Sequence, residues 1–430
     1  MYIFLAVSSA LFAGLMLTRV FRLLKLNFPD VTAFLIAGLL IGPYGLGQIG
    51  LKGLGFVSMR DVEAISIVNT TALGFIAFSI GSEFRLEELK HTGRQATIIG
   101  IFQAVVAAAL VDVVLAVIHF ILGEEVFPLS AAIVLGAIAS ATAPAATLMV
   151  VRQYKADGPL TRLLLPIVAL DDAVGLVIYS VSMGIARAMQ GGNLDMISIG
   201  INPLLEIICS LILGAVLGLC LSLLEKLFHS NSNRLSLTIS FVLLTIALSY
   251  LEIPVGPVTI SFSSLLVCMM LGTIFCNVSE FSGDIMQRAE KWTAPLNASF
   301  FVLSGAELEL SVFQNPAYVA IGVIYIIARS LGKYIGARIS STATGCDENV
   351  RKYLGITLLP QAGVALGMCA QAMVLGEFEG TIIRNVTLFG VLIYELVGPL
   401  LTRNALMKAG EIAPIPENKK TRERFRVNAR

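Results

Sequence analysis

One apolar segment of the chain carries two adjacent carboxylates near its middle: residues 161–188 read TRLLLPIVALDDAVGLVIYSVSMGIARA. The segment is longer than the roughly 20 residues needed to cross the hydrocarbon core of a membrane. If its helix begins near Arg162, a rise of about 1.5 Å per residue places Asp171 roughly 14 Å deep, close to the bilayer centre. The sequence therefore predicts a transmembrane helix with Asp171 and Asp172 at its midplane.

The composition of the whole chain agrees with a membrane location. Of its 430 residues, 56% are hydrophobic and only 14% are charged, against about 25% charged residues in an average soluble domain. The net charge of +1 gives no basic excess that would favour a nucleic-acid partner. The six cysteines are scattered without a CxxC motif or a Cys/His cluster, so neither a disulfide framework nor a zinc site is expected.

Apolar stretches of about 20 residues recur along the chain and predict an all-α polytopic membrane protein with about 13 transmembrane helices. The first is predicted to be a retained span rather than a signal peptide, because its cations follow the apolar run. The tail after Arg403 is basic and is predicted to be poorly ordered. The predicted spans are 2–20, 31–50, 64–83, 96–122, 129–151, 161–188, 203–226, 235–251, 257–277, 292–310, 316–340, 351–376 and 380–403.

Lys and Arg are concentrated in alternate loops, and this asymmetry keeps its phase along the chain. One set of loops, together with the tail, holds most of the cations, whereas the other holds only Lys52, Arg60, Arg187 and Arg384. Short cytoplasmic loops carry the excess of Lys and Arg in membrane proteins. We therefore expect an odd number of spans, with the N-terminus outside and the C-terminus in the cytoplasm.

Two of the predicted spans contain helix-breaking stretches. Residues 140–147 read SATAPAAT, including Ser140, Thr142 and Pro144, and residues 357–363 read TLLPQAG, including Pro360, Gln361 and Gly363. Proline removes a backbone donor, and nearby polar side chains can satisfy the carbonyls that it frees. Two such helices in oppositely oriented halves indicate an inverted-repeat transporter with its site at the midplane, although an ordinary kink in each helix is the simpler alternative.

The adjacent carboxylates Asp171 and Asp172 require a partner, a proton or a cation at that depth, because a membrane-buried charge is costly. Burial and a neighbouring like charge both favour the protonated form, so the pair can take either H⁺ or a cation. Successive helix positions differ by about 100°, so the two side chains face different neighbours. This geometry argues for two separate roles and against an intramembrane aspartyl protease, whose two acids must face one peptide bond.

Two cations inside the predicted span 316–340 are candidate partners of the acid pair. Arg329 and Lys333 are four residues apart on one helix face. Either could pair with Asp171, or both could extend to the cytoplasmic headgroups.

Glu395 and Asp112 are further acids within spans, and each is either part of a proton path or a structural hydrogen-bonding residue. Glu307 and Glu309 are predicted to lie at an interface. The GxGxxG match at 45–50 follows a membrane span rather than a strand and is interpreted as a loop.

The acid pair, the broken span around Pro144 and the Gly-Lys-x-x-Gly stretch of residues 332–336 resemble the monovalent cation:proton antiporter superfamily, in particular its sodium/hydrogen-exchanger and Kef-like branch. The resemblance extends to residues 37–43, 300–308 and 398–402 and covers the chain to about residue 405. It implies an inverted-repeat fold with two crossing broken helices, a homodimer and elevator-type alternating access. The implied parts are scaffold segments 1–95 and 235–310, core segments 96–190 and 316–405, a linking helix 200–228 and a cytoplasmic tail 406–430.

The same resemblance implies roles for the site residues. Asp172 would be the main ion and proton site, Asp171 would exchange a salt bridge with Lys333 for cation contact, and Thr142 would line the site. Members with an acid pair and a lysine typically exchange two protons for one Na⁺ or Li⁺, so Na⁺ is preferred here over K⁺. The implied protein is not an enzyme, has no cofactor other than its transported ions and lies in the plasma membrane of a prokaryote. A sodium-coupled symporter of an organic acid is the alternative function.

Overall fold

The computed structural model describes residues 2–24, 28–50, 55–82, 84, 86–190, 202–251, 253–255, 258–308, 310 and 315–412. Residues 413–430, which hold the basic cluster of the predicted tail, and Glu309 lie outside this described part, whereas α16 continues to Lys408. Within the helices, the surroundings of some residues, including the Asp172 side chain and Gly363, lie outside it as well.

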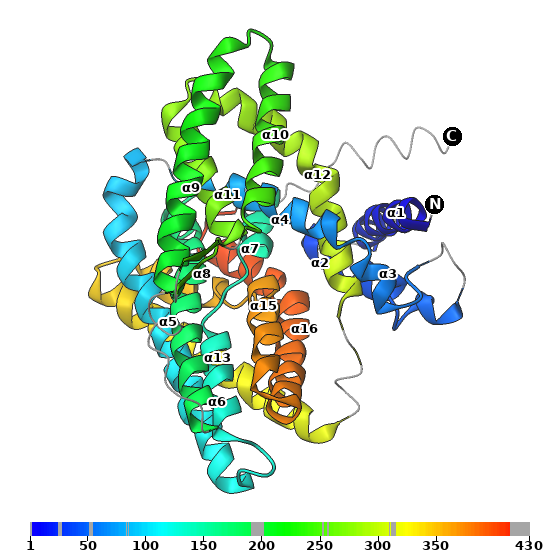
Figure 1. Cartoon of the computed structure of the whole chain (residues 1–430), viewed down its shortest axis with the longest axis vertical. Helices are drawn as coiled ribbons and strands as arrows, with labels where there is room; N and C mark the ends of the chain where they lie inside the picture. The colour runs from blue at the N-terminus through cyan, green and yellow to red at the C-terminus, as the bar shows by residue number, and fades with distance from the viewer. Residues whose placement is uncertain are drawn as a thin grey trace.

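Helices make up nearly all of the described chain, as the sequence predicted (Figure 1). A short antiparallel hairpin, in which Val255 pairs with Val258, is the exception. The elements are α1 (Tyr2–Leu23), α2 (Asp30–Ile41), η1 (Leu46–Ile49), α3 (Met59–Glu63), α4 (Ser66–Gly81), α5 (Leu86–Leu122), α6 (Leu129–Ala139), α7 (Pro144–Tyr154), α8 (Pro159–Met189), α9 (Asn202–Leu224), η3 (Glu225–Leu227), α10 (Asn231–Leu248), β1 (Ile253–Val255), β2 (Val258–Ile260), α11 (Ser264–Val278), α12 (Ser282–Ala306), α13 (Pro316–Ala343), α14 (Glu348–Thr357), α15 (Gly363–Ala372), η5 (Met373–Leu375) and α16 (Glu377–Lys408).

Each predicted span coincides with a helix or an interrupted helix, but the number 13 itself is not confirmed. In the described chain, eight helical segments are long and apolar enough to cross a membrane, and three further apolar helices are shorter. Some boundaries were wrong. The span predicted at 257–277 begins as strand β2, and its helix α11 starts only at Ser264. Helix α12 begins at Ser282 rather than 292, because its polar first turns carry no hydropathy signal.

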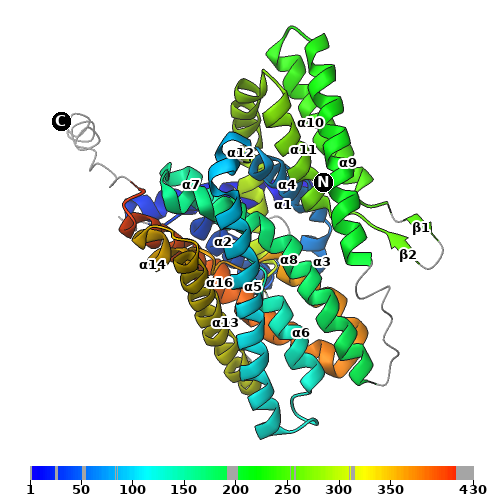
Figure 2. The same cartoon turned by 90° about the vertical axis from the view of Figure 1, so that its left-hand side faces the viewer.

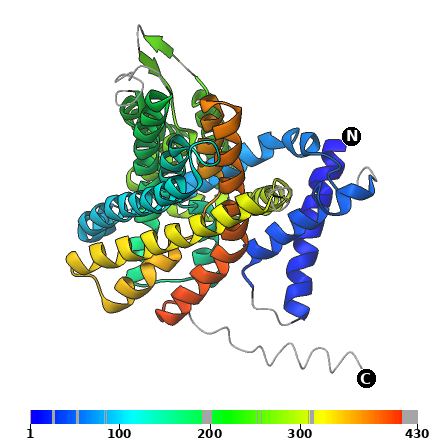
Figure 3. The same ribbon diagram turned by 90° about the horizontal axis from the view of Figure 1, so that it is seen from below.

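The helices pack in two groups. In the first, α11 packs against α4 and α9, and α12 packs against α1, α2 and α4, with α10 beside them. In the second, α5 packs against α6, α8 and α13, while α16 packs against α13, α14 and α15. Figure 2 shows α13 lying alongside α5. Figures 1 and 3 both place α1 on the side of the molecule away from α5.

The two predicted helix breaks occur in the second group. Residues 140–143 separate α6 from α7, and residues 358–362 separate α14 from α15. Pro144 is the first residue of α7, a position where its fixed φ suits a helix start and its missing N–H costs nothing. The Ala143 backbone N–H donates to the Pro360 carbonyl at 2.8 Å. The two non-helical segments are therefore in direct contact.

Candidate functional site

Asp171 lies beside the contact between the two broken helices and is fully buried. The Thr142 hydroxyl donates to its Oδ2 at 2.6 Å, and the Gln103 amide donates to its Oδ1. Lys333 Nζ lies 3.0 Å from Oδ2 and forms an ion pair with it. Helix α8, the first broken helix, α5 and α13 thus all contribute to the surroundings of a single carboxylate.

Lys333 is also completely buried, rather than extended to the headgroups. Its ammonium group donates to the Ser140 carbonyl at 2.6 Å and to the Thr142 hydroxyl at 2.9 Å, in addition to Asp171. These contacts use all three donors of an ammonium group. The Ser140 carbonyl is free to accept because Ser140 is the C-cap that directly follows the last residue of α6.

Arg329 binds the ends of the two broken helices through backbone carbonyls, and it forms no ion pair with a described carboxylate. Its guanidinium donates to the carbonyls of Ala139 at 2.9 Å, Ala141 at 2.6 Å and Leu359 at 2.7 Å. The last carbonyls of a helix lack intrahelical partners and carry about half a negative charge. A buried guanidinium with a fixed fork of donors satisfies several of them at once. Arg329 therefore stabilises the crossing of α6 and α14.

Gln361 adds a further polar contact to the crossing. Its amide donates to the Ile138 carbonyl at 2.9 Å and is hydrogen-bonded to the Tyr325 hydroxyl. With Arg329 and Lys333, it supplies polar partners for backbone carbonyls that would otherwise be unpaired in an apolar interior, where each unsatisfied group is costly.

Among the described residues, neither Asp112 nor Glu395 is hydrogen-bonded to Asp171 or Arg329. Asp112 follows Gln103 by nine residues on α5, about 13 Å along the helix axis, and is so close to Gly136 that a Cβ there would overlap its carboxylate. Glu395 is buried on α16, and its charged neighbour is Glu307. Glu307 accepts a hydrogen bond from Asn69 at 2.7 Å and is partly buried, and its predicted place at an interface stays a prediction.

The residue that sequence reasoning missed is Gln103. The available signal was an amide in the middle of the apolar stretch 96–122, where a polar side chain must find a partner inside the protein. Asp172 follows Asp171 in α8, but its side chain lies outside the described residues. The structure therefore documents one carboxylate of the pair.

Comparisons with known proteins agree with one another. The family profile described as sodium/hydrogen exchanger, transmembrane, matches residues 7–408. The Na(+)/H(+) antiporter NhaS4 of Synechocystis sp. is 22% identical over 403 residues, which cover 90% of this chain and 94% of that protein.

The fold is shared with the sodium proton antiporter MjNhaP1 from Methanocaldococcus jannaschii. Its structure at pH 8 matches with a TM-score of 0.65 and 20% identity, covering 94% of this chain and 97% of that chain. A second structure of the same protein, from a 3D EM map, matches with a TM-score of 0.74 and 16% identity, covering 95% and 98%.

Proposed function

The chain belongs to the sodium/hydrogen exchanger family, whose members are membrane transporters rather than enzymes, and from this premise we propose that it exchanges Na⁺ for H⁺ at the Asp171–Asp172 pair. The observation that carries the proposal is the buried ion pair between Asp171 and Lys333. A carboxylate held by an ammonium group at a helix break can release that partner and take a cation instead.

The formal charges at the crossing support competition between cation and proton. Asp171, Lys333 and Arg329 together carry one positive charge, and an ionised Asp172 brings the sum to zero. A Na⁺ ion added to this balanced set leaves an excess positive charge in a poorly solvated site. Loss of the Lys333 proton as Na⁺ binds would remove the excess.

Exchange is therefore proposed to be electrogenic. In the proposed cycle, Asp172 and Lys333 each release a proton when one Na⁺ binds, and each regains a proton when Na⁺ leaves. Two protons then move for each Na⁺, and one net charge crosses the membrane per cycle. In proteoliposomes, an imposed membrane potential is expected to drive Na⁺ uptake or release according to its sign. Exchange that is insensitive to the potential would exclude this stoichiometry.

The structural change is proposed to be elevator-type. The second helix group, residues 96–190 and 316–405, would be the core that moves. The first group, residues 1–95 and 235–310, would be the scaffold, joined to the core by residues 200–228. A homodimer formed through the scaffold, in a prokaryotic plasma membrane with the N-terminus outside, completes the proposal.

The function is tested with Asp172→Asn in everted membrane vesicles. The variant keeps the size of the side chain but cannot ionise, so Na⁺-dependent proton movement is expected to be abolished. Asp284→Asn, an exposed acid in the first turn of α12, is the control and should retain exchange. Full activity in Asp172→Asn would refute the assignment of the ion site.

A further inference from the structure

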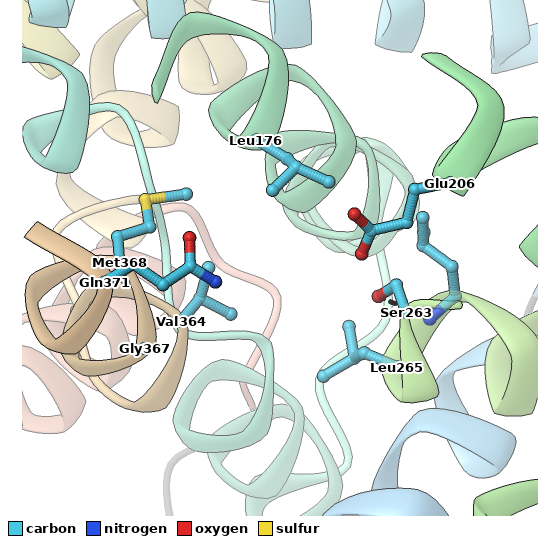
Figure 4. A pocket seen from close by; sticks show the side chains of 9 residues that line it. Leu176, Glu206, Ser263, Leu265, Val364, Gly367, Met368 and Gln371 are labelled. Carbon is cyan, nitrogen blue, oxygen red and sulfur yellow. Dashed lines mark hydrogen bonds between the residues drawn. The ribbon is translucent and has the colours of Figure 1, made fainter. Parts of the chain in front are cut away.

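A cavity of about 190 Å³ lies where the two helix groups meet, between α8 and α15 on one side and α9 and α11 on the other. Figure 4 shows Leu176 and Met368 lining it from α8 and α15, with the Glu206 carboxylate directed toward it from α9. A water molecule occupies about 30 Å³ of liquid, so this space accommodates several waters.

Glu206 is the charged residue among those that line the cavity. Within the described part of the chain, no Lys, Arg or His side chain forms an ion pair with it. Ser263 and Gln371 add further oxygen atoms to the same lining. A carboxylate with neutral oxygen donors and no counter-charge is a suitable environment for a hydrated monovalent cation.

Met368 connects the lining of the cavity to residues around the Asp171 site. Met368 lines the cavity, and its Cε lies 3.4 Å from the position that a Cβ on Gly175 would take. The same position is 3.2 Å from Ser140 Oγ. Ser140 supplies the carbonyl to which Lys333 donates. Met368 therefore stands between the cavity and the broken helix, and its unbranched side chain can change rotamer readily.

We propose that this cavity is an antechamber in which Glu206 binds the hydrated cation before it passes Met368 to reach the acid pair. The inference rests on the proposed function and extends it to a second cation site. Glu206 belongs to α9, which packs with the first helix group, so its charge stays in place when the second group moves. Leu176, which lines the cavity, follows Asp172 by one helical turn on α8, so the cavity lies about one turn along this helix from the acid pair.

The first test is the Na⁺ dependence of exchange in proteoliposomes. Glu206→Gln is expected to raise the KM for Na⁺ roughly fivefold, the effect of one partly exposed ion pair, and to leave kcat unchanged. Glu206→Asp should restore most of the affinity. Glu377→Gln, an exposed acid at the start of α16, is the matched control and should change neither parameter. An unchanged KM in Glu206→Gln, or a loss of kcat alone, would overturn the proposal.

The second test does not depend on transport. A Cβ on Gly367 would meet no atom within 4 Å, so Gly367→Cys places a thiol in the cavity without a clash. The experiment uses a background without the native cysteines, and each labelling rate is divided by the rate of the same reagent with a free thiol in solution. A cationic methanethiosulfonate should then label Gly367→Cys faster than an anionic one. Na⁺ should slow the cationic reagent more than choline does. Adding Glu206→Gln should remove both effects, and labelling that ignores this change would overturn the proposal.

The two tests separate the two proposals. If the wild-type protein shows no Na⁺-dependent proton movement, the proposed function fails, and the labelling ratio still decides whether Glu206 makes the cavity cation-selective. If exchange occurs and the labelling ratio is independent of Glu206, the antechamber fails alone.

Discussion

Asp171 receives donors from three separate parts of the chain: Gln103 from α5, Thr142 from the helix break and Lys333 from α13. An ion pair removed from water loses most of its hydration, and it persists only if its remaining hydrogen-bonding capacity is satisfied. Here the ammonium has three acceptors and the carboxylate has three donors. The pair is therefore stable as a unit, and either partner alone would be a buried, uncompensated charge.

Lys333→Met is expected to destabilise the protein by about 3–5 kcal/mol at neutral pH, because it removes the ion-pair partner of the buried Asp171 carboxylate. The double variant Lys333→Met/Asp171→Asn should recover much of this loss. The deficit of the single variant should also shrink as the pH falls, because protonation of Asp171 removes the unpaired charge. Thermal unfolding in detergent at several pH values measures these differences.

The control is Lys352→Met, which removes an exposed lysine from α14 and should change the unfolding temperature little at any pH. Equal destabilisation of the single and double variants would show that Lys333 contributes by packing rather than by charge.

Some residues of this site could be predicted from the sequence, and others could not. Asp171 and Lys333 were predictable, because charge inside an apolar span is rare and needs a partner. Gln103 was not identified, since a neutral amide gives a weaker signal and its partner is 68 residues away. The contacts of Arg329 could not be predicted either, because its acceptors are backbone carbonyls that become free only once both helices break at one place.

At the level of elements, two glycines bring α13 close enough to α5 to form the site. A Cβ on Gly332 would lie 2.7 Å from the Ala107 Cα, and one on Gly336 would lie 2.8 Å from the Gln103 Cα. Both neighbours are backbone atoms, which cannot move without shifting the helix. The Gly-Lys-x-x-Gly stretch therefore has a direct structural purpose: small residues on both sides of Lys333 allow the close packing that small residues give in membrane helices.

Gly336→Val is expected to push α13 away from α5 at Gln103, and so to weaken both the Gln103 contact and the Lys333 ion pair with Asp171. We expect a lower unfolding temperature and a strong loss of Na⁺-dependent proton movement, because overpacking of this kind costs about 1–3 kcal/mol or more. Gly283→Ala, at a position in α12 with open space around it, is the matched control and should be neutral or slightly stabilising. Normal exchange by Gly336→Val would show that this close approach is dispensable.

Arg329→Lys tests the connection between the two broken helices. An ammonium group cannot reproduce the planar fork that binds three carbonyls, so at least one charge-assisted hydrogen bond should be lost, at about 1.5–3 kcal/mol each. The variant should unfold at a lower temperature but keep its formal charge. If its stability equals that of the wild-type protein, the guanidinium geometry is not what holds the helix ends together.

The two helix breaks could be predicted from the sequence, whereas the start of α11 could not. Pro144 and Pro360 marked the ends of the broken helices, because proline acts locally on the backbone. The start of α11 was missed because residues 258–260 are as apolar as the helix that follows, and hydropathy does not distinguish a strand from a helix over so short a run.

At the scale of the whole molecule, polar contacts join the two helix groups at one end of α7. Arg152 Nη1 lies 2.9 Å from Glu290 of α12 and 3.4 Å from the Ser79 hydroxyl of α4. The Gln153 side chain accepts from the Asp30 backbone N–H of α2 at 2.8 Å. Such partly exposed contacts are individually weak, so they can hold one arrangement of the groups and still release it during a transport cycle.

A covalent link across this contact should stop exchange if one group must move past the other. We expect Ser79→Cys/Arg152→Cys, in a background without the native cysteines, to lose Na⁺-dependent proton movement when a short thiol-specific crosslinker joins the two positions. A crosslinker is preferred to a direct disulfide, because the length of the arginine side chain separates the two backbones by more than a disulfide spans. The uncrosslinked double variant provides the baseline rate.

The matched control joins two positions within the second group. The Gln95 amide of α5 donates to the Thr344 carbonyl after α13 at 3.0 Å, so Gln95→Cys/Thr344→Cys places a link where no relative motion is required. That link should leave exchange intact, while the link between the groups stops it. Full exchange in both crosslinked proteins would mean that the ion site opens to each side by local rearrangement around the broken helices, and the elevator-type motion would have to be abandoned.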